Sequence, residues 1–400
     1  MMDTRWATVK RVLAIRLDNL GDVLVTTPAI HAIRESLPDA HITLLASPVG
    51  AQVGRLDPDI DDVIVYEAPW MDPWQRLPQD SAREQRMIRQ LRNGHFDGAI
   101  MFTSYHQSPL PAAYLAYLAD IPLRVAASID GPGSLLTTRH KHPDGLMHEV
   151  ERGLDLVGTV GMSTSDRDLV LRVPNRARAK VRALPELAGI RAAPASTSSQ
   201  RGKKGRPDGQ DAAPLVVVHP GCSMPARTYP WEMYARVVDL LVEHTGAWVV
   251  LTGAADEREM VQRVYMAVRP ALRRYVQPLA GRLSFPELCA LIEMAHLTIT
   301  NNTGPMHISA AVKTPVVALF ALTNPPEQWG PWGVAHRQLY HDVPCRICYS
   351  RVCPYTHECL RMLTPELVVA AARGLLDAAA STAPTRPHAR SMVSIRGGDR

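Results

Sequence analysis

The chain has no long hydrophobic run. None of its 400 residues fall in a stretch approaching the roughly 18 to 20 consecutive apolar residues that a membrane-spanning helix requires. The first residues, Met1 to Arg5, lack the charged start and apolar run of a signal peptide. We therefore expect an intracellular protein located in the cytoplasm.

Several common catalytic signatures are also missing. There is no Gly-x-Ser-x-Gly elbow, no phosphate-binding Gly-x4-Gly-Lys-Ser/Thr loop, and no Gly-x-Gly-x2-Gly after the first predicted strand. The acidic run 57–62 precedes a predicted strand instead of ending one, so we interpret it as a solvated turn and not as a metal site. A net charge of +5 is too modest to indicate a nucleic-acid partner.

The length of the chain and its 46% apolar content suit a globular protein of two domains. In the first half, short apolar strands alternate with helices, an order typical of a parallel sheet with helices on both faces. We expect strands at 12–17, 42–46, 63–66 and 99–102, and helices at 23–37, 82–91 and 111–118.

The composition changes to Ala, Ser, Pro, Gly, Lys and Arg between residues 191 and 213, where we predict a disordered linker or loop. Its basic residues lack the aromatic neighbours that would stack on bases, so we expect no nucleic-acid arm. The strand–helix pattern restarts after it, with strands at 215–219, 248–252, 297–300 and 315–320 and helices at 230–243, 257–268, 285–294 and 365–378.

This pattern predicts an α/β protein with two Rossmann-like parallel-sheet domains that face a cleft. The expected domains are 1–190 and 214–379, and a disordered tail follows at 380–400. Ligands of such sheets bind at the carboxyl ends of the strands, so the residues that follow each strand are the candidates for a site.

A turn of small polar residues joins the strand ending near Thr300 to the next helix. It contains Asn302, Thr303 and Gly304, and His307 lies one turn into the helix. The first N–H groups of a helix have no intrahelical partner and favour a phosphate group. An ordinary capped helix has the same sequence pattern, and on these residues alone it is the favoured interpretation.

Asp22 follows Gly21 at the start of the first predicted helix. Asp is a preferred N-cap residue, and by spacing alone capping is the favoured role. A carboxylate at the carboxyl end of a strand is also placed to act as a general base.

Two further strand ends carry polar groups. Gly221, Cys222 and Arg227 follow the first strand of the second domain, where a glycine turn and an Arg would hold a diphosphate; a solvent-facing Arg before a proline-started helix is an equal alternative. Asp256 follows the next strand, where an acid would accept hydrogen bonds from a ribose, although capping of the helix after it is favoured.

Four of the six cysteines lie close together, at Cys345, Cys348, Cys353 and Cys359, with His341 and His357 nearby. Three states stay open for them: a structural zinc site, reduced packed thiols, or a disulfide. The spacing is not that of two matched Cys-x2-Cys pairs, so packed thiols are favoured.

Taken together, the chain resembles glycosyltransferase family 9, the bacterial ADP-heptose:lipopolysaccharide heptosyltransferases. The resemblance extends from about residue 12 to residue 376, apart from the linker. It rests on the ordered set of segments 16–29 (RLDNLGDVLVTTPA), 219–221 (HPG), 301–311 (NNTGPMHISAA) and the cysteine segment 345–360.

The resemblance implies a GT-B fold, with an acceptor-binding N-terminal domain and a C-terminal domain that binds a nucleotide-sugar. It implies an inverting transfer that needs no metal cofactor, with Asp22 as the base, so that catalysis becomes the favoured role for that residue. Arg227 falls on the family's diphosphate-binding position. The donor motif of the family falls on Asn302, Thr303, Gly304 and His307.

The expected partners are ADP-heptose as donor and a lipopolysaccharide-core or related glycan as acceptor. Ser104, Arg124 and Arg152 are the expected acceptor-binding residues. Such an acceptor lies at the inner membrane, which implies transient contact with the membrane surface.

Two residues depart from the family pattern. Asn302 stands where an Asp is usual, and Ala255 stands at the position of the ribose-binding acid, with Asp256 beside it. These two departures leave open a transferase of the same fold that uses another nucleotide-sugar. A non-catalytic nucleotide-sugar sensor is a second alternative, and a zinc-dependent nucleic-acid module, based on the cysteine cluster and the basic linker, is a third.

Overall fold

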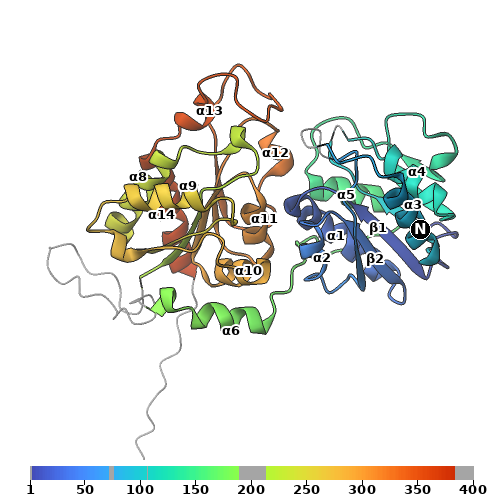
Figure 1. Cartoon of the computed structure of the whole chain (residues 1–400), viewed down its shortest axis with the longest axis horizontal. Helices are drawn as coiled ribbons and strands as arrows, with labels where there is room; N and C mark the ends of the chain where they lie inside the picture. Colours follow the sequence, from blue (N-terminus) through green and yellow to red (C-terminus); the bar gives the residue numbers. More distant parts are fainter. Residues whose placement is uncertain (1, 72–75, 106, 189–212, 383–400) are drawn as a thin grey trace, which may run out of the picture.

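A computed structural model describes residues 2–71, 76–105, 107–188 and 213–382, which form two α/β domains side by side (Figure 1). Most of the predicted linker and nearly all of the predicted tail lie outside these ranges. Among the described residues, no helix combines the length and the apolar character that crossing a bilayer requires.

The N-terminal domain is built on a six-stranded parallel sheet with the order β3-β2-β1-β4-β5-β6. Its strands are β1 (Arg11–Arg16), β2 (His41–Ala46), β3 (Asp62–Val65), β4 (Gly98–Met101), β5 (Leu123–Ala127) and β6 (Thr138–His140). Its helices are α1 (Leu20–Ser36), α2 (Ala51–Gly54), α3 (Ser81–Asn93), α4 (Leu110–Leu118) and α5 (Glu149–Gly158), with a 3-10 turn η1 (Gly133–Leu135).

The C-terminal domain repeats this plan with the order β12-β11-β10-β7-β8-β9. Its strands are β7 (Leu215–His219), β8 (Trp248–Leu251), β9 (Val276–Pro278), β10 (Leu297–Asn301), β11 (Val316–Leu319) and β12 (His336–Leu339). Its helices are α8 (Trp231–Thr245), α9 (Arg258–Ala267), α10 (Phe285–Met294), α11 (Gly304–Ala311), α12 (Pro326–Trp329), α13 (Glu358–Arg361) and α14 (Pro365–Thr382), with 3-10 turns η3 (Pro225–Arg227) and η4 (Arg273–Tyr275).

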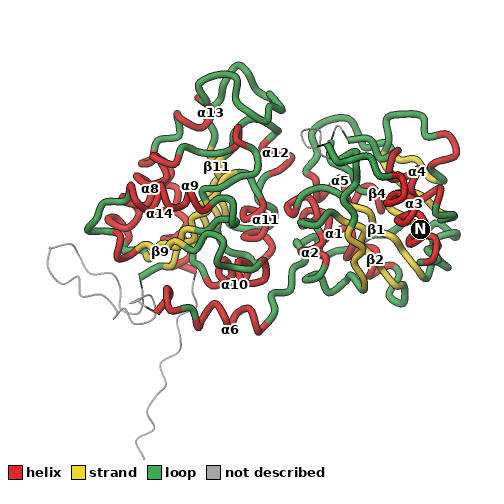
Figure 2. The backbone as a smooth tube through the Cα atoms, in the orientation of Figure 1, coloured by secondary structure: helices red, strands yellow, loops and turns green. Residues whose placement is uncertain are grey.

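The central strands are buried on both faces, which explains why they are rich in apolar residues and show no regular alternation with polar ones. In β7, all five residues, Leu215 to His219, are buried. In the N-terminal domain, α1 and α5 pack together on one face of the sheet, while α3 and α4 pack on the other (Figure 2). The sheets thereby bring their strand ends, and the turns that follow them, to one edge in each domain.

The chain crosses between the domains before α6 (Asn175–Ala183), which lies beneath the C-terminal domain and packs on α10 (Figure 1). The guanidinium Nε of Arg178 lies 2.6 Å from a carboxylate oxygen of Glu293 in α10. The 3-10 turn η2 (Pro185–Leu187) follows, and its Glu186 pairs with Arg282 at 2.6 Å. Segment 175–188 therefore packs on the C-terminal domain, although the boundary predicted from sequence lies at residue 190.

The two domains touch through the starts of α1 and α11. A Cβ atom added to Gly21 would stand 2.7 Å from Cδ2 of His307, and one added to Gly304 would stand 3.2 Å from a methyl group of Leu20. Because these distances leave no room for a side chain at Gly21, the glycine permits the two helices to approach closely.

The predicted strands and helices are present, with bounds that shift by at most four residues. The sequence analysis missed β5, β6, α2, α5 and α6 in the first half and β9, β12, α12 and α13 in the second, and most of these are short or polar elements. It was also wrong about the acidic run 57–62 in one respect, because Asp57 is not solvated but 4% exposed.

Candidate active site

A cleft of about 920 Å³ opens between the carboxyl ends of the two sheets. Residues from both domains line it, among them Asp22 and Ser104 from the N-terminal domain and Arg227, Thr323 and Gln328 from the C-terminal domain. Its outer part is apolar and includes Trp70, Met71 and Trp329. The position is the one where α/β sheets bind ligands.

Asp22 both caps α1 and faces the cleft. Its Oδ2 accepts a hydrogen bond from the backbone N–H of Asn19 at 3.0 Å, one half of a capping box. Its Oδ1 lies 3.3 Å from the Nη2 of Arg16 and accepts a hydrogen bond from the Ser104 hydroxyl at 3.3 Å. The carboxylate is 15% exposed. The two roles weighed for Asp22 therefore do not exclude each other, since each uses a different oxygen.

Arg16, at the end of β1, is a buried cation surrounded by three carboxylates. Its side chain is 3% exposed and lies 2.9 Å from Asp18, 3.3 Å from Asp22 and 3.8 Å from Glu149. Burial raises the pKa of Asp18 to about 6, although Arg16 opposes that shift. These contacts connect the end of β1 to the start of α1 and to α5.

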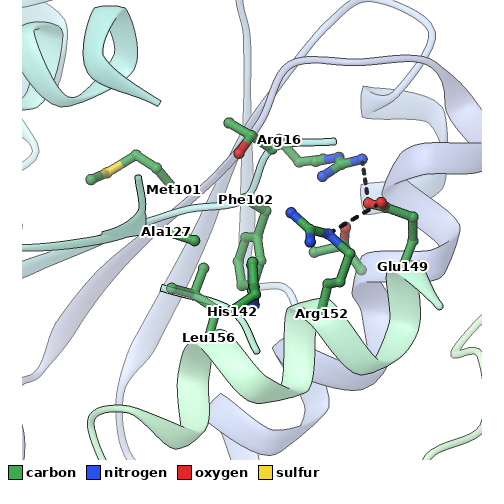
Figure 3. A pocket seen from close by; sticks show the side chains of 11 residues that line it. Arg16, Met101, Phe102, Ala127, His142, Glu149, Arg152 and Leu156 are labelled. Carbon is green, nitrogen blue, oxygen red and sulfur yellow. Dashed lines mark ion pairs between the residues drawn. The ribbon is translucent and has the colours of Figure 1, made fainter. Parts of the chain in front are cut away.

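Of the three expected acceptor residues, Ser104 lines the cleft and Arg152 lines a smaller pocket beside it. Figure 3 shows this pocket, where the side chains of Arg16 and Arg152 both point toward the carboxylate of Glu149. The Nε of Arg152 lies 3.3 Å from Glu149, and its guanidinium lies over the ring of Tyr105. Both pockets contain Phe102 and Thr103, so they adjoin.

Arg124, the third expected acceptor residue, lies outside both pockets and ties parts of the backbone together. Its guanidinium donates to the carbonyl oxygens of Ser134 and Leu135 at 2.9 and 2.8 Å and to those of Ile121 and Pro122. The residue is 9% exposed and lines neither pocket. Four of its five N–H donors are thereby used to tie the start of β5 to the segment around η1.

The turn between β10 and α11 is held in place by Asn301, whose role the sequence analysis missed. Its side-chain oxygen accepts from Tyr229 N–H and from the Tyr234 hydroxyl, both at 3.0 Å, and its amide donates to the carbonyls of Pro220 and Gly221. Every hydrogen-bonding position of this buried amide is thereby used. Asn301 joins the turn after β7 to the turn after β10, which brings Gly221 and Cys222 beside Thr303.

The residues predicted to bind an anion gather around that junction. Asn302 is buried and donates to Asn324 at 2.8 Å, and Thr303 is the N-cap of α11. The thiol of Cys222 is in hydrogen-bonding contact with the Thr303 side chain, and burial raises the pKa of this thiol. Cys222 is therefore a neutral neighbour of the turn and not a thiolate nucleophile.

His307 is a neutral histidine in this setting. It is 3% exposed, and burial lowers its pKa to about 3. Its Nδ1 has no hydrogen-bond partner among the described residues. An uncharged imidazole with a vacant ring nitrogen can bind a ligand through a hydrogen bond but not through charge.

Arg227, in η3, brings a positive charge to the C-terminal wall of the cleft. Its Nε donates to the hydroxyl of Thr323 at 2.8 Å, which fixes the side chain. Burial lowers the pKa of Arg227, while the nearby Cys222 and Asp22 raise it. Because a guanidinium keeps its proton at neutral pH, Arg227 faces Asp22 across the domain boundary as a cation.

The acid at the end of β8 that faces the neighbouring strand is Glu257 and not Asp256. Asp256 is exposed, whereas the Glu257 carboxylate is 17% exposed and accepts from Ala254 N–H at 2.7 Å. A Cβ atom on Gly221 would lie 2.0 Å from Oε1 of Glu257, so this carboxylate lies directly over the glycine turn. Glu257 is the residue directly after Asp256, the acid that the sequence analysis expected at this place.

The cysteine segment forms part of the same wall. The carbonyl of Arg351 accepts from Ala226 N–H at 2.9 Å, and His357 Nε2 lies 2.7 Å from the Ala226 carbonyl, so the segment supports η3. Burial raises the pKa of the Cys359 thiol, and Cys345, Cys348 and Cys353 lie near enough to raise it further. All four cysteines are unpaired in the structure.

Within the described ranges, the one group of His, Cys, Asp and Glu ligand atoms that lie within 4.8 Å of one another is His140, His142 and Asp155. The cysteine quartet does not meet that distance. Ring nitrogens of both histidines lie within 2.7 Å of the same oxygen of Asp155. Hydrogen bonds among these three side chains thus link β6 and the loop after it to α5.

Comparisons with known proteins agree with this geometry. The family model of glycosyltransferase family 9 (heptosyltransferase) matches residues 85–358. Lipopolysaccharide heptosyltransferase 3 of Escherichia coli strain K12 is 26% identical over 369 residues, which cover 91% of this chain and 97% of that protein.

Solved structures show the same fold. The glycosyltransferase family 9 protein of Veillonella parvula superposes with a TM-score of 0.71 at 21% identity, covering 94% of this chain and 98% of the other. E. coli ADP-heptose lipopolysaccharide heptosyltransferase II superposes with a TM-score of 0.69 at 21% identity, covering 92% and 99%. The fold is therefore GT-B, as the two sheets indicate. Since the family model matches more than half of its length, the chain belongs to glycosyltransferase family 9, the heptosyltransferase family, and is a glycosyltransferase.

Proposed function

We propose that this enzyme transfers a heptose from ADP-heptose to a sugar hydroxyl of a lipopolysaccharide-core glycan, with inversion at the anomeric carbon and without a metal cofactor. The observation that carries the proposal is that Asp22 and Arg227 line one cleft from opposite domains. A carboxylate and a guanidinium placed in this way suit the two ends of a glycosyl transfer, the incoming hydroxyl and the departing diphosphate.

In the proposed reaction, Oδ1 of Asp22 accepts the proton of the acceptor hydroxyl as that oxygen attacks the anomeric carbon. The bond from this carbon to the diphosphate breaks on the opposite face, so the configuration inverts. The capping hydrogen bond at Oδ2 and the Ser104 hydroxyl at Oδ1 fix the direction of the carboxylate. A positioned general base typically contributes about 10²- to 10⁴-fold to a rate.

Negative charge that builds on the diphosphate is stabilised from the C-terminal domain. Arg227 supplies a fixed positive charge, and the start of α11 supplies the N–H groups near Thr303 and Gly304. His307 contributes a hydrogen bond, not a charge, because it is neutral. Removing one such group typically costs about 10²- to 10³-fold in rate.

For the donor ribose we assign Glu257 instead of Asp256. Its carboxylate lies over Gly221 at the ends of β7 and β8, where acidic side chains bind ribose hydroxyls in sheets of this kind. For the acceptor we keep Ser104 and Arg152 and leave out Arg124. Contact of the protein with the inner membrane, through such an acceptor, stays a prediction from the sequence.

The test of this function is the variant Asp22→Asn, assayed for sugar transfer from ADP-heptose to lipopolysaccharide that lacks its heptoses. We expect a loss of at least about 10²-fold in kcat with ADP affinity unchanged. A folded Asp22→Asn enzyme with near-normal transfer would defeat the proposal.

A second candidate differs only in the donor, and Asn302 motivates it. Its amide is turned to Asn324, so the turn lacks the carboxylate that is usual there. Calorimetry with ADP, UDP and GDP separates the two, because a clear preference for UDP or GDP would favour another nucleotide-sugar.

A further inference from the structure

A buried chain of polar contacts leads from the C-terminal domain to the carboxylate of Asp22. It begins at Gln328 in α12, which is 2% exposed and donates through Nε2 to Oε1 of Glu149 at 2.5 Å. Glu149 is the first residue of α5 and belongs to the other domain. Its second oxygen, Oε2, lies 3.8 Å from Nη2 of Arg16, and that same nitrogen lies 3.3 Å from Oδ1 of Asp22.

The contacts around α12 show that this is a docked interface between the domains. The ring of His148 lies 3.0 Å from the carbonyl of Gly330 through its Nε2 and packs on Trp332 with a centroid distance of 4.6 Å. Two adjacent residues of the N-terminal domain, His148 and Glu149, thus contact segment 328–332 of the C-terminal domain. When the domains separate, both contacts are lost together.

Arg16 has more negative neighbours than it can bind equally well. Its Nη2 donates to the Ser104 hydroxyl at 2.7 Å and to Asp22 Oδ1 at 3.3 Å. Oε2 of Glu149 lies 3.8 Å from the same nitrogen. A buried carboxylate without enough donors attracts any nearby cation strongly, because unpaired buried charge is costly. The Nε of Arg152 lies 3.3 Å from the same carboxylate but forms no hydrogen bond with it, so Gln328 is the side chain that donates to Glu149 within the described part of the chain. Without Gln328, Glu149 competes with Asp22 for Arg16.

We propose that Arg16 is a positioning residue for Asp22, and that Gln328 keeps Arg16 in place by satisfying Glu149 when the two domains are together. In the separated state Glu149 draws the guanidinium away from Asp22 and Ser104. The base is therefore correctly held only while the donor-binding domain is docked. This inference rests on the proposed function of Asp22, and its test is built so that the two can fail separately.

The experiment compares Gln328→Ala with Lys313→Ala in the full-length enzyme. Lys313 also bridges the two domains, through a contact of 2.6 Å with Asp168, but it has no connection to Arg16. Transfer from ADP-heptose to heptose-deficient lipopolysaccharide gives kcat, and calorimetry with ADP gives the donor affinity. Melting temperatures show that each variant is folded, and Gln328→Asn serves as a second variant that keeps the amide but shortens its reach.

We expect Gln328→Ala and Gln328→Asn to lower kcat about 10- to 100-fold, the size of one lost hydrogen bond to a charged group, without changing ADP affinity. Lys313→Ala should stay within about fivefold of the parent enzyme, as an exposed ion pair predicts. In an Asp22→Asn background, measured by single turnover, Gln328→Ala should cause no further loss, because it acts through Asp22.

Three results would overturn the inference: an unchanged kcat in Gln328→Ala, an equal loss in Lys313→Ala, or a full additional loss in the Asp22→Asn background. The third outcome would show that Gln328 acts on another part of the site. Failure of the proposed function has a different signature, since it would appear as near-normal transfer by Asp22→Asn alone.

Discussion

The ring of His307 lies against the backbone of Gly21, across the boundary between the two domains. The residue beside Gly21 is Asp22, so the proposed base lies next to the contact between α1 and the helix that carries the proposed donor turn. This places two motifs that are nearly 300 residues apart in the sequence within one site. The close approach of α1 and α11 also depends on residue 21 being glycine, which has no side chain.

We predict that Gly21→Ala lowers activity more than it lowers stability. The added Cβ would stand 2.7 Å from Cδ2 of His307, closer than side chains approach, so α1 and α11 must move apart. A displacement of about 1 Å near reacting groups can cost about 10²-fold in rate. Steady-state kinetics together with thermal unfolding measure both effects. Gly158→Ala is the matched control, because a Cβ there meets nothing within 4 Å.

We predict that Glu257→Gln raises the KM for ADP-heptose about 10- to 100-fold, as expected when a charged hydrogen bond to a ribose hydroxyl is weakened. Asp256→Asn should leave KM unchanged, since Asp256 is exposed beside it. Donor titration at saturating acceptor gives both values. If Asp256→Asn raised KM and Glu257→Gln did not, the residue chosen from the sequence would be the correct one after all.

Most strands of the two sheets could be predicted from the sequence because buried parallel strands are rich in apolar residues, although the inner strand β5, which contains Arg124, was missed. It failed where an element is short or polar, as in β6 and β12, because such edge strands are specified by pairing with a neighbour and not by their own residues. The candidate site also could be predicted only in part. Motifs pointed to Asp22, Ser104 and Arg227, which line the cleft, but the sequence does not indicate that Arg124 donates to backbone carbonyls.

The contacts of Arg16 also could not be predicted from the sequence. Arg16 stands in a motif that the sequence analysis quoted, yet its contacts come from Ser104 and Glu149, which follow it by 88 and 133 positions in the chain. The role of such a residue depends on which distant groups the fold brings to it. The choice between Asp256 and Glu257 is similar, because one helical position decides which of two adjacent acids faces the site.

We predict that transfer does not depend on a divalent cation. Arg227 and the N–H groups at the start of α11 provide the positive potential that a metal ion supplies in other transferases. Full kcat is expected after treatment with EDTA, with no gain on adding Mg²⁺ or Mn²⁺. Activity that disappears with EDTA and returns with either ion would contradict the prediction.

The same chelator treatment also distinguishes the possible states of the cysteine segment, if the melting temperature is measured together with kcat. A structural zinc held by Cys345, Cys348, Cys353 and Cys359 would support η3, so its removal by a strong chelator would lower the melting temperature. Reduced packed thiols predict no change in melting temperature and no zinc by elemental analysis. Recording both values alongside kcat keeps a structural metal distinct from a catalytic one.

The last prediction concerns Asp57, which is buried far from the cleft. Its Oδ1 accepts from Asp59 N–H at 2.9 Å, while its Oδ2 has no hydrogen-bond partner within the described residues. Burial raises the pKa of this carboxyl from 3.8 to about 7. Because the folded state holds the proton more tightly than the unfolded chain, the contribution of Asp57 to stability is greatest below about pH 4 and is lost as the pH rises through 7.

Asp57→Asn removes that charge and keeps the shape of the side chain. We expect the variant to be more stable than the parent by about 1 to 3 kcal/mol at pH 8, where the parent must bury a carboxylate, and to differ little from it at pH 4. Denaturant unfolding at the two pH values measures the difference. Asp39→Asn, at an exposed position, controls for the change in net charge. A gain of the same size at both pH values would show that the stabilisation comes from the amide and not from removal of a titrating group.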